Sequence, residues 1–304
     1  MLKGIILAGG RGTRLYPITR AVNKQLLPIY DKPLVYYPLS TLMLAGIRDI
    51  LVITTPGDRP QFARLLRDGS QWGIRLCYAE QSKPEGIGQA LLIGADFIAS
   101  DRVVLALGDN ILFGHGLPEL LKVAAGRKTG ATIFAHQVRN PERYGVVSFD
   151  DGGKAIRIEE KPKDAASNWA IPGLYFFDDD AVRYAAEVKP SWRGELEITD
   201  LHNRYLAAGA LQVEKMGRGF AWFDTGTFEG LIDAASFVQT LEHRQGMKIA
   251  CPEEIAYRMG FIDRAHLLEL AQSLNKSGYG EYLLNLLDAR SAGAAVSQVV
   301  SRSN

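Results

Sequence analysis

A glycine-rich segment near the start of the chain has the composition of a phosphate-binding loop. It reads Leu7-Ala8-Gly9-Gly10-Arg11-Gly12-Thr13-Arg14-Leu15, and its glycines allow backbone N–H groups to turn toward anionic oxygens. Arg14 could add a forked cation. No Gly-Lys-Ser or Gly-Lys-Thr closes the segment, so it is not a P-loop. Leu15 stands where the dinucleotide-binding fingerprint has its third glycine, so that motif is absent as well.

A lysine ten residues beyond Arg14 is the second candidate for a phosphate contact. Lys24 lies in Asn23-Lys24-Gln25-Leu26-Leu27-Pro28, and a lysine in such a setting is more often a solvated loop residue. Lysines also bind phosphate as point charges. The nearness of the glycine-rich segment favours that second role.

Two aspartates come directly after apolar runs. Asp109 follows Leu105-Ala106-Leu107-Gly108, and Asp224 follows Trp222-Phe223. Mg²⁺ takes one or two carboxylates together with phosphate oxygens and water. Each aspartate alone could equally be a turn residue or a helix N-cap. Together with the glycine-rich segment, they indicate a site for a nucleotide and a metal ion.

A charged cluster, Glu159-Glu160-Lys161-Pro162-Lys163, ends a further predicted strand. Such clusters are mostly solvated surface, but Pro162 restrains the chain directly after Lys161, so a held cation is the alternative. Hydrolytic chemistry finds no support, because no Gly-x-Ser-x-Gly elbow occurs. The five histidines show neither metal-binding nor triad spacing: His115, His136, His202, His243 and His266.

The candidate phosphate-binding residues follow short apolar segments that predict strands. Such segments occur at 4–7, 50–53 and 103–107, and helical spacing occurs between them at 33–45 and 87–98. Strands that alternate with helices predict a parallel sheet with right-handed crossovers. Ligands bind at the carboxyl ends of the strands in such sheets.

The pattern changes after about residue 130. Strands are predicted at 132–135, 145–149 and 154–158, with a hairpin turn at Asp150-Asp151-Gly152-Gly153. Later strands and helices are expected at 174–177, 221–223, 197–208, 228–244, 265–274 and 279–287. These elements predict one α/β body with a helical C-terminal extension and a frayed tail at 288–304.

Composition excludes several classes of protein. The 304 residues include 35 Lys and Arg against 34 Asp and Glu, a formal net charge of +1, which argues against a nucleic-acid-binding protein that relies on a basic face. No apolar run reaches the ~18 to 20 residues of a membrane span, and no signal-peptide cleavage site follows the N-terminus. Cys77 and Cys251 predict inert thiols in a reducing compartment. We therefore expect a cytoplasmic protein without a membrane or nucleic-acid partner.

Taken together, the motifs resemble the sugar-1-phosphate nucleotidylyltransferase family. The signature is the segment 7–15 followed by Lys24-Gln25-Leu26-Leu27-Pro28, and the resemblance extends to about Leu287. Other matching segments are Asp31-Lys32-Pro33, Tyr36-Tyr37-Pro38-Leu39-Ser40, Leu107-Gly108-Asp109-Asn110, Glu142-Arg143-Tyr144-Gly145-Val146-Val147, Glu159-Glu160-Lys161-Pro162, Gly194-Glu195-Leu196-Glu197-Ile198-Thr199-Asp200 and Trp222-Phe223-Asp224-Thr225-Gly226. Within the family, the match is best to members that use dTTP and glucose 1-phosphate.

The resemblance implies a role for each matched residue. The nucleotide-binding set is Leu7, Ala8, Gly9, Gly10, Gly12, Thr13, Gln25, Gln81, Gly86 and Asp109, with Gln25 and Gln81 at the thymine edge and Gly86 against the base. The catalytic cations are Arg14 and Lys24, which hold the phosphates, and Lys161, which orients the sugar phosphate. The sugar-binding set is Asn110, Tyr144, Gly145, Glu160, Lys161, Ile171 and Tyr175. Asp109 and Asp224 are the implied ligands of Mg²⁺, the expected cofactor.

The implied reaction is transfer of a thymidylyl group from dTTP to α-D-glucose 1-phosphate, which gives dTDP-glucose and pyrophosphate. The attacking phosphate oxygen is already anionic, so the reaction needs charge neutralisation and alignment rather than a general base. The resemblance further implies the first step of dTDP-L-rhamnose biosynthesis and a homotetramer. Feedback inhibition by dTDP-rhamnose is implied near Cys251-Pro252-Glu253-Glu254 and Arg218.

The resemblance also sets the expected organisation of the chain. The fold class is α/β, with a Rossmann-like mixed, mainly parallel sheet flanked by helices, a sugar-binding β-region and a C-terminal helical extension. The nucleotidylyltransferase body is expected over 1–250, with the nucleotide part at about 1–130 and the sugar-binding part at about 131–250. The extension is expected over 251–287 and the frayed tail over 288–304.

Two departures from the family pattern leave alternatives open. Gly88 stands where the pattern has alanine, and Pro172 stands where it has threonine in the sugar pocket. Neither touches the reacting phosphates, so the implied reaction class is unaffected and fine selectivity for the sugar stays open. One alternative is an enzyme that uses UTP or ATP, since pocket contacts the size of one methyl group discriminate only ~10- to 200-fold. The other is a catalytically silent regulatory subunit of the same fold, which should have lost Arg14, Lys24, Asp109 or Asp224.

Overall fold

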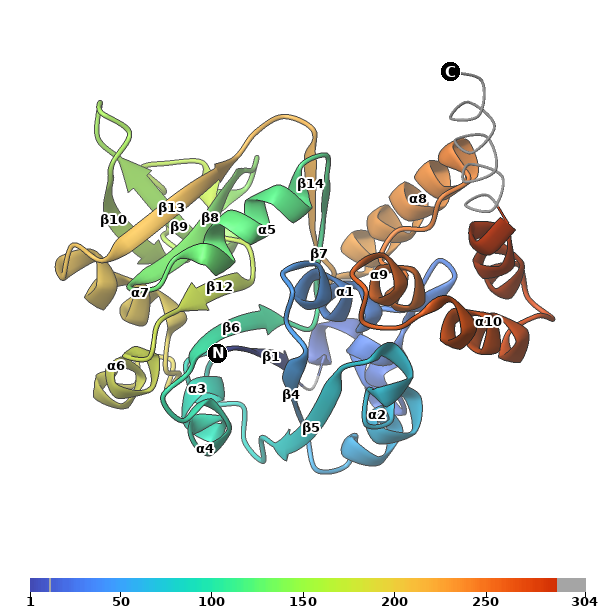
Figure 1. The fold of residues 1–304 in the computed structure, drawn as a ribbon. Coiled ribbons are helices and arrows are strands. Elements are labelled where there is room, and N and C mark those ends of the chain that lie inside the picture. The colour runs from blue at the N-terminus through green and yellow to red at the C-terminus, as the bar shows by residue number, and fades with distance from the viewer. Residues whose placement is uncertain (11, 289–304) are drawn as a thin grey trace, which may run out of the picture.

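A computed structural model describes residues 1–10 and 12–288, which form one large sheet with helices on both faces (Figure 1). Four strands of the N-terminal half lie in parallel: β1 (Leu2–Ala8), β4 (Asp49–Thr54), β5 (Arg75–Glu80) and β6 (Arg102–Leu107). β1 lies between β4 and β6, and β5 lies outside β4. The predicted parallel arrangement is confirmed in this half, although β5 lies where the sequence pattern predicts no strand.

The second half of the sheet is mixed. β12 (Leu174–Phe177) pairs antiparallel with both β6 and β8 (Ala131–Gln137), and so joins the two halves. β11 (Trp169–Ala170), β9 (Gly145–Phe149) and β10 (Ala155–Glu160) continue the sheet in antiparallel pairings. β13 (Leu211–Met216), which the sequence pattern does not predict, pairs parallel with β8. The prediction of a mixed α/β sheet is confirmed.

Apolar side chains that alternate along the central strands pack against helices on both faces of the sheet. Ile6, Val52 and Val104 face α1 (Tyr36–Leu44), α2 (Arg59–Leu66) and α5 (Leu117–Gly126) in one apolar core. Their neighbours Ile5 and Leu51 face α3 (Gln89–Ile93), α4 (Ala95–Ile98), α6 (Ala181–Glu187) and α7 (Ile198–Ala207) in another. Buried strands with apolar residues on both faces are the expected centre of such a three-layer fold.

The helix expected over 87–98 is divided in two at Gly94. Gly94 ends α3 and precedes α4, and a Cβ at this position would lie 2.8 Å from Cδ1 of Ile5. The helix therefore breaks where it packs most closely on β1. Helical spacing alone cannot show this break, because the cause is a contact with a distant strand.

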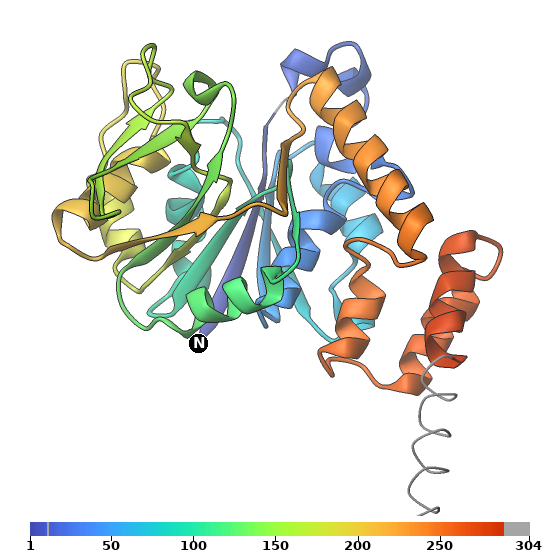
Figure 2. The ribbon, with the colours of Figure 1, turned by 90° about the horizontal axis from the view of Figure 1, so that it is seen from above.

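A separate two-stranded arm connects the two halves of the sheet. β7 (Asn110–Gly114) follows β6 after a two-residue turn and pairs antiparallel with β14 (Phe220–Asp224). Figure 2 shows the extended chain that leaves β13 and crosses toward the N-terminal half of the sheet to form β14. The register places Asn110 opposite Asp224, so the arm brings together the two predicted metal-binding segments.

Helix α8 (Phe228–Gln245) lies over the short hairpin of β2 (Pro28–Ile29) and β3 (Lys32–Pro33) in a third, smaller core. A buried charge cluster holds this contact together. Lys32 Nζ and Lys248 Nζ donate to the two carboxylate oxygens of Glu242 at 2.9 and 3.1 Å, and Asp31 pairs with both lysines. The hairpin that follows Lys24 is thereby fixed to the second half of the chain.

The C-terminal extension packs as helices against the body. It contains α9 (Pro252–Arg258), α10 (Arg264–Ser273) and a helix over 278–288, and Trp72 Nε1 donates to Glu253 Oε1 at 3.0 Å. Residue 288 is helical, and the rest of the predicted frayed tail, 289–304, lies outside the described residues. No helix in the described part of the chain combines the length and apolar character that crossing a membrane requires.

Candidate functional site

The predicted site residues converge at the carboxyl ends of β1 and β6. A cavity of about 440 Å³ opens there, between the two halves of the sheet and the β7–β14 arm. Most of the predicted residues line it: Leu7, Gly10, Arg14, Lys24, Gln25, Asp109, Asn110, Tyr144, Gly145, Glu160, Lys161, Ile171, Tyr175 and Asp224. Residues that lie more than 200 positions apart in the sequence thus come together at one edge of the sheet.

The glycine-rich loop leaves β1 and turns directly above this edge. Gly12 has a φ of +61°, and Leu15 N donates to its carbonyl at 2.9 Å to start a short 3₁₀ turn over Thr13–Leu15. A side chain at Gly9 would overlap Oε1 of Gln81. The exposed side chain of Arg14 lies beside Gly226, next to Asp224. The loop therefore presents backbone at Gly9 and Gly10 and a cation at Arg14.

Lys24 and Asp109 form an ion pair at the floor of the cavity. Lys24 Nζ pairs with Asp109 Oδ2, and Asn110 Nδ2 donates to Asp109 Oδ1 at 3.0 Å. Burial alone would raise the pKa of Asp109, but the charge of Lys24 and these hydrogen bonds outweigh it, so the pKa lies below its ordinary value. Asp109 is therefore an anion that is ready to take a cation.

Asp224 faces Asp109 across the arm and has the opposite tendency. Thr225 closes the arm beyond Asp224, because its N–H and its hydroxyl both donate to the carbonyl of Asp109, at 3.1 and 2.8 Å. Burial and the charge of Asp109 raise the pKa of Asp224, against a hydrogen bond from Gly226 N at 3.0 Å. A divalent cation placed between the two carboxylates would offset their mutual repulsion, and Mg²⁺ is typically held by one or two such groups.

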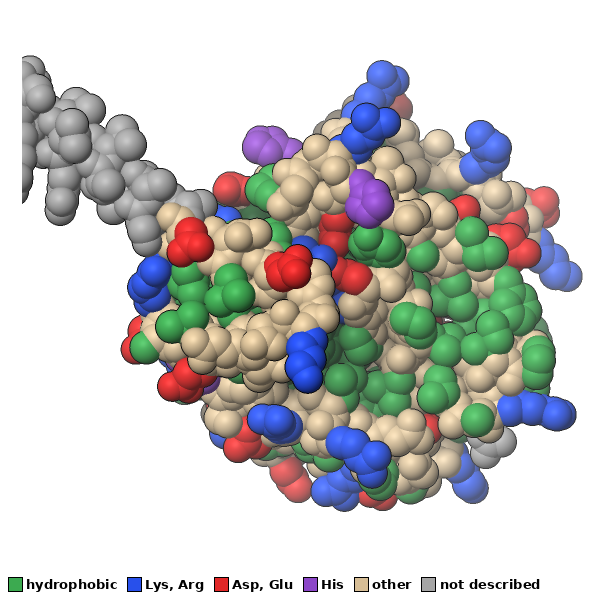
Figure 3. Space-filling model, turned by 90° about the vertical axis from the view of Figure 1, so that its right-hand side faces the viewer, with side chains coloured by type: hydrophobic (Ala, Val, Ile, Leu, Met, Phe, Trp, Pro, Cys, Tyr) green, Lys and Arg blue, Asp and Glu red, His purple; other side chains and the backbone are tan. Residues whose placement is uncertain are grey.

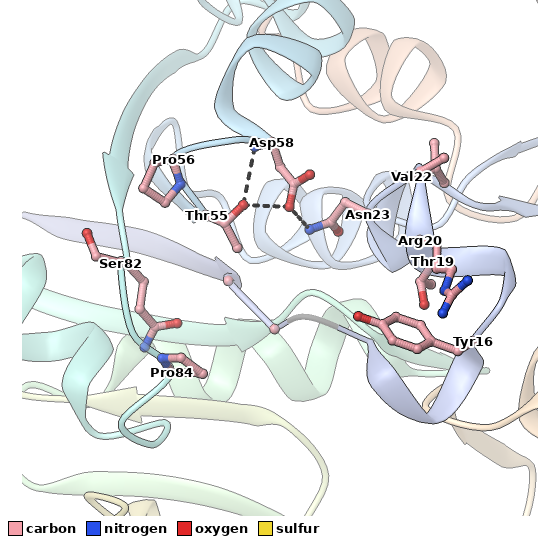
Figure 4. A pocket seen from close by; sticks show the side chains of 14 residues that line it. Tyr16, Thr19, Arg20, Val22, Asn23, Thr55, Pro56, Asp58, Ser82 and Pro84 are labelled. Atoms are coloured by element: carbon pink, nitrogen blue, oxygen red, sulfur yellow. Dashed lines mark hydrogen bonds between the residues drawn. The ribbon is translucent and has the colours of Figure 1, made fainter.

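A second cavity of about 340 Å³ adjoins the first at Gly10 (Figure 4). Gly9 and Gln81 line it, together with Asn23, Thr55 and Asp58. Asn23 Nδ2 and Thr55 Oγ1 donate to Asp58 Oδ2 at 2.7 and 2.6 Å, as the dashed lines in Figure 4 show. The two glutamines expected to contact one base border different cavities, Gln25 the larger and Gln81 the smaller.

The side-chain amide oxygens of the two glutamines have different surroundings. That of Gln25 has no hydrogen-bond partner among the described residues, and that of Gln81 is turned toward the glycine-rich loop. Gln25 is buried, and its backbone N–H donates to Asn23 Oδ1 at 2.9 Å. No hydrogen-bond donor within the described residues reaches its side-chain Oε1. Gln81 Nε2 donates to Gln89 Oε1 at 2.6 Å, which turns its own Oε1 toward Gly9. The Gln25 amide oxygen is thus a buried acceptor without a partner among the described residues, and that of Gln81 lies against the glycine-rich loop.

The far wall of the larger cavity comes from the second half of the chain. Lys161 directly follows β10 with a φ of +44°, and its Nζ pairs with Glu160 Oε1 at 3.2 Å. A left-handed conformation is unfavourable for lysine, and the Lys161 N–H donates to the Tyr144 carbonyl at 2.9 Å to hold it. Gly145 has no room for a side chain, since a Cβ would lie 2.9 Å from Cγ2 of Thr199. The wall combines a fixed cation with close-packed backbone.

The cavity also has residues that sequence reasoning missed. Arg143, Trp222 and His202 line it, and Arg193 lies beside it, with Nη2 3.4 Å from Glu160 Oε1 and 2.8 Å from Glu197 Oε2. Arg143 and Trp222 lie within motifs that the sequence singled out and Arg193 directly precedes one, so their position was the available signal. His202 has no such signal, because only the packing of α7 brings it to the cavity.

Four predicted nucleotide-binding residues do not border either cavity: Ala8, Gly12, Thr13 and Gly86. Gly86 has a φ of +104°, and a Cβ there would lie 2.5 Å from the backbone N of Leu196. On both sides of it, Leu196 N donates to the Glu85 carbonyl at 2.7 Å and Gly88 N donates to the Leu196 carbonyl at 3.0 Å. In this structure Gly86 therefore permits a contact between the loop after β5 and the segment that carries Arg193.

Comparison with known proteins agrees with this geometry. Residues 3–240 match the sequence pattern of the nucleotidyl transferase family. The chain is 59% identical over 286 residues to the glucose-1-phosphate thymidylyltransferase of Neisseria meningitidis serogroup A, a match that covers 94% of this chain and 99% of the relative. A Bacillus anthracis protein crystallised with sucrose, provisionally assigned as a glucose-1-phosphate thymidylyltransferase, is similar with a TM-score of 0.72 at 41% identity, covering 78% of this chain and 95% of that one. The structure of UDP-glucose pyrophosphorylase in complex with UDP-glucose is similar with a TM-score of 0.68 at 26% identity, and the match covers 79% of this chain and 99% of that one.

Proposed function

The chain belongs to the nucleotidyl transferase family, and from this premise we propose that it is a glucose-1-phosphate thymidylyltransferase. It transfers the thymidylyl group of dTTP to α-D-glucose 1-phosphate and releases pyrophosphate. The observation that carries this proposal is the larger cavity, where the glycine-rich loop, the Lys24–Asp109 pair, Asp224 and Lys161 meet. Curated relatives at 56–59% identity carry this name.

The residues of the cavity suit an in-line displacement at the α-phosphorus of the nucleotide. A phosphate oxygen of glucose 1-phosphate forms a bond to that phosphorus while the bond to the pyrophosphate oxygen breaks. Arg14 and Lys24 lie on the nucleotide side and neutralise the nucleotide phosphates, and Lys161 on the opposite wall holds the attacking phosphate. Two polyanions must approach each other, so fixed cations and alignment supply most of the acceleration.

The two carboxylates fit a divalent cation bound together with substrate phosphates. No group of three or more potential metal-ligating side chains occurs among residues 1–10 and 12–288, which suits Mg²⁺, because Mg²⁺ needs only one or two carboxylates when phosphates and water complete its shell. Asp109 and Asp224 would hold the ion. When bound, Mg²⁺ neutralises phosphate charge and relieves the repulsion that raises the pKa of Asp224.

Use of UTP is the second candidate function, because the likeness to UDP-glucose pyrophosphorylase extends over 79% of this chain. The two nucleotides differ at the base by one methyl group, which contributes only ~10- to 200-fold selectivity in a fitted pocket. The amides of Gln25 and Gln81 can pair with the edge of either pyrimidine. We propose dTTP as the preferred donor on the strength of the relatives at 56–59% identity.

The test is pyrophosphate release from purified protein with glucose 1-phosphate and Mg²⁺, compared across dTTP, UTP, ATP, CTP and GTP. We expect the highest kcat/KM with dTTP, a smaller value with UTP, and loss of the reaction in excess EDTA. No release with any nucleotide would overturn the proposal and would favour the silent regulatory subunit. Equal kcat/KM with dTTP and UTP would replace thymidylyl transfer by a broader pyrimidine activity.

Four further properties follow as proposals from the resemblance. They are supply of dTDP-glucose for dTDP-L-rhamnose synthesis, feedback inhibition by dTDP-rhamnose at the extension, a homotetramer, and location in the cytoplasm. Apolar side chains exposed on and after α8, such as Ile232 and Met247, support an assembly, and Figure 3 shows hydrophobic side chains gathered on this side of the molecule among charges of both signs. Size-exclusion chromatography with light scattering tests the tetramer, and dTDP-rhamnose titration tests the inhibition.

A further inference from the structure

His202 is a buried histidine at the sugar-side end of the larger cavity. It lies on α7, is 0% exposed and borders the cavity beside Tyr175 and Thr199. The imidazole stacks on Phe177 with ring centroids 5.9 Å apart at 21°, and contacts the Tyr175 ring at 4.9 Å. The imidazole is therefore held against two aromatic rings at the border of the cavity.

Neither ring nitrogen of His202 has a hydrogen-bond partner among the described residues. A buried polar group without a partner destabilises a folded protein, and a buried histidine with two such atoms therefore requires an explanation. Burial lowers the pKa of His202 to about 3, so the ring is neutral at physiological pH. A neutral imidazole carries one donor and one acceptor.

The chemistry around His202 identifies the group that it can bind. Either nitrogen of a neutral imidazole can pair with a hydroxyl group, which both donates and accepts, whereas an ionised phosphate can use only the N–H. The cations Arg14 and Lys24 line the nucleotide side of the cavity, whereas His202 adjoins Tyr175, Thr199 and Ile198 on the other side. The reaction at phosphorus requires no base, so His202 is not needed for proton transfer.

We propose that His202 binds a ring hydroxyl of the hexose in the sugar subsite and thereby contributes to the choice of sugar. The contact is made by one imidazole nitrogen, either to the hydroxyl directly or through one water held between them. This inference rests on the proposed function, because it assigns the hydroxyl to the sugar phosphate substrate.

The first test compares the Michaelis constants of both substrates in His202→Phe. Phenylalanine keeps the stacking on Phe177 and removes both nitrogens, so KM for glucose 1-phosphate should rise about tenfold while KM for dTTP changes less than about twofold. His202→Asn restores a donor and an acceptor and should recover part of the loss. A structural role would instead change both KM values together or neither.

The second test identifies the hydroxyl with deoxy analogues. Wild-type protein and His202→Phe are assayed with the 2-, 3-, 4- and 6-deoxy forms of glucose 1-phosphate. For the analogue that lacks the contacted hydroxyl, the two proteins should have equal kcat/KM, because the interaction is already absent. If His202→Phe is impaired by the same factor with every analogue, the ring contacts no sugar hydroxyl and the proposal is wrong.

His136 provides a matched control for this substitution. Its Nδ1 is also buried without a partner among the described residues, but it does not line the larger cavity. His136→Phe should leave KM for glucose 1-phosphate within about twofold of wild type. An inactive wild-type protein would contradict the proposed function itself, whereas an active wild type with an unchanged His202→Phe, correctly folded by circular dichroism, would contradict only the role of His202.

Discussion

The two sides of the larger cavity are built by different means. On the proposed nucleotide side, the loop after β1 supplies backbone at Gly10, with Gly9 in the adjoining smaller cavity, and it turns with Gly12 at a φ of +61°. On the proposed sugar side, single side chains come from β10, β12 and α7, β9 contributes the backbone of Gly145, and Lys161 has a φ of +44° without being glycine. The first side is a local device, and the second depends on the correct packing of distant segments.

Because of this difference, substitutions can change one kind of recognition more easily than the other. A backbone loop recognises phosphates and is insensitive to most side-chain changes. A wall made from separate side chains can change one contact at a time, which suits selection among sugars. Substitutions on the two sides should therefore affect different kinetic constants, whereas substitutions at the junction of the two sides should affect turnover itself.

The largest effect is expected at the cavity floor, where the nucleotide side meets the sugar side, from Asp109→Asn and Lys24→Ala. Each change removes one member of the ion pair at the cavity floor, and kcat should fall by roughly 10²- to 10³-fold without loss of the folded structure. Steady-state kinetics with circular dichroism checks this. Asp101→Asn, an aspartate that pairs with Lys3 and the N-terminus, is the control, and turnover near wild type in either variant would remove that residue from the mechanism.

On the sugar side, Lys161→Ala should raise KM for glucose 1-phosphate by roughly 10- to 100-fold. Loss of a charge-assisted contact to phosphate is the cause, and KM for dTTP should stay within about twofold. Lys163→Ala, an exposed lysine two positions later in the chain, should have little effect. A parallel rise of both KM values in Lys161→Ala would contradict the separation of the two sides.

On the nucleotide side, Gly9→Ala should raise KM for dTTP by about tenfold, a loss similar to that of one good contact. The added Cβ displaces the Oε1 end of Gln81, and KM for glucose 1-phosphate should not follow. Gly126→Ala places the same methyl group where nothing lies within 4 Å and should match wild type. The same kinetic assay measures both variants.

The smallest effect is a stabilisation by Asp224→Asn without metal. The pKa of Asp224 is raised in the folded state, so the stabilisation from its proton is complete below the pKa of the unfolded chain and is lost as pH rises through the folded value. At pH 7 in EDTA the variant should therefore melt roughly 1–3 °C higher than wild type. Added Mg²⁺ should stabilise wild type more than the variant, and a lower melting temperature of the variant in EDTA would contradict this electrostatic picture.

The nucleotide side could be predicted because its residues are adjacent in the sequence. A short segment, 7–15, contains the strand end, the glycines and Arg14, so composition and spacing were enough to place it at the carboxyl edge of a parallel sheet. The strands β1, β4 and β6 were found for the same reason, since buried parallel strands are short apolar runs.

The sugar side could be predicted only where the family resemblance supplied the residues. His202 and Arg193 reach the cavity through the packing of α7 and its preceding loop, and no local pattern reports that packing. The strands β7 and β13 were missed because each is recognised by a partner far away in the chain, Phe220–Asp224 for β7 and Ala131–Gln137 for β13. The break at Gly94 has the same origin, a distant contact with Ile5.

The pairing of β7 with β14 sets the relative positions of the two carboxylates. A strand advances about 3.3 Å per residue and alternates its faces, so the pairing of Asn110 with Asp224 fixes both the spacing and the side on which the second carboxylate lies. Deleting one residue from the turn at 217–219 would shift Asp224 by one position in this register and turn its side chain to the opposite face of the arm, away from Asp109. The proposed binding of a divalent cation would therefore depend on the pairing register of β7 and β14 as much as on the two acidic side chains.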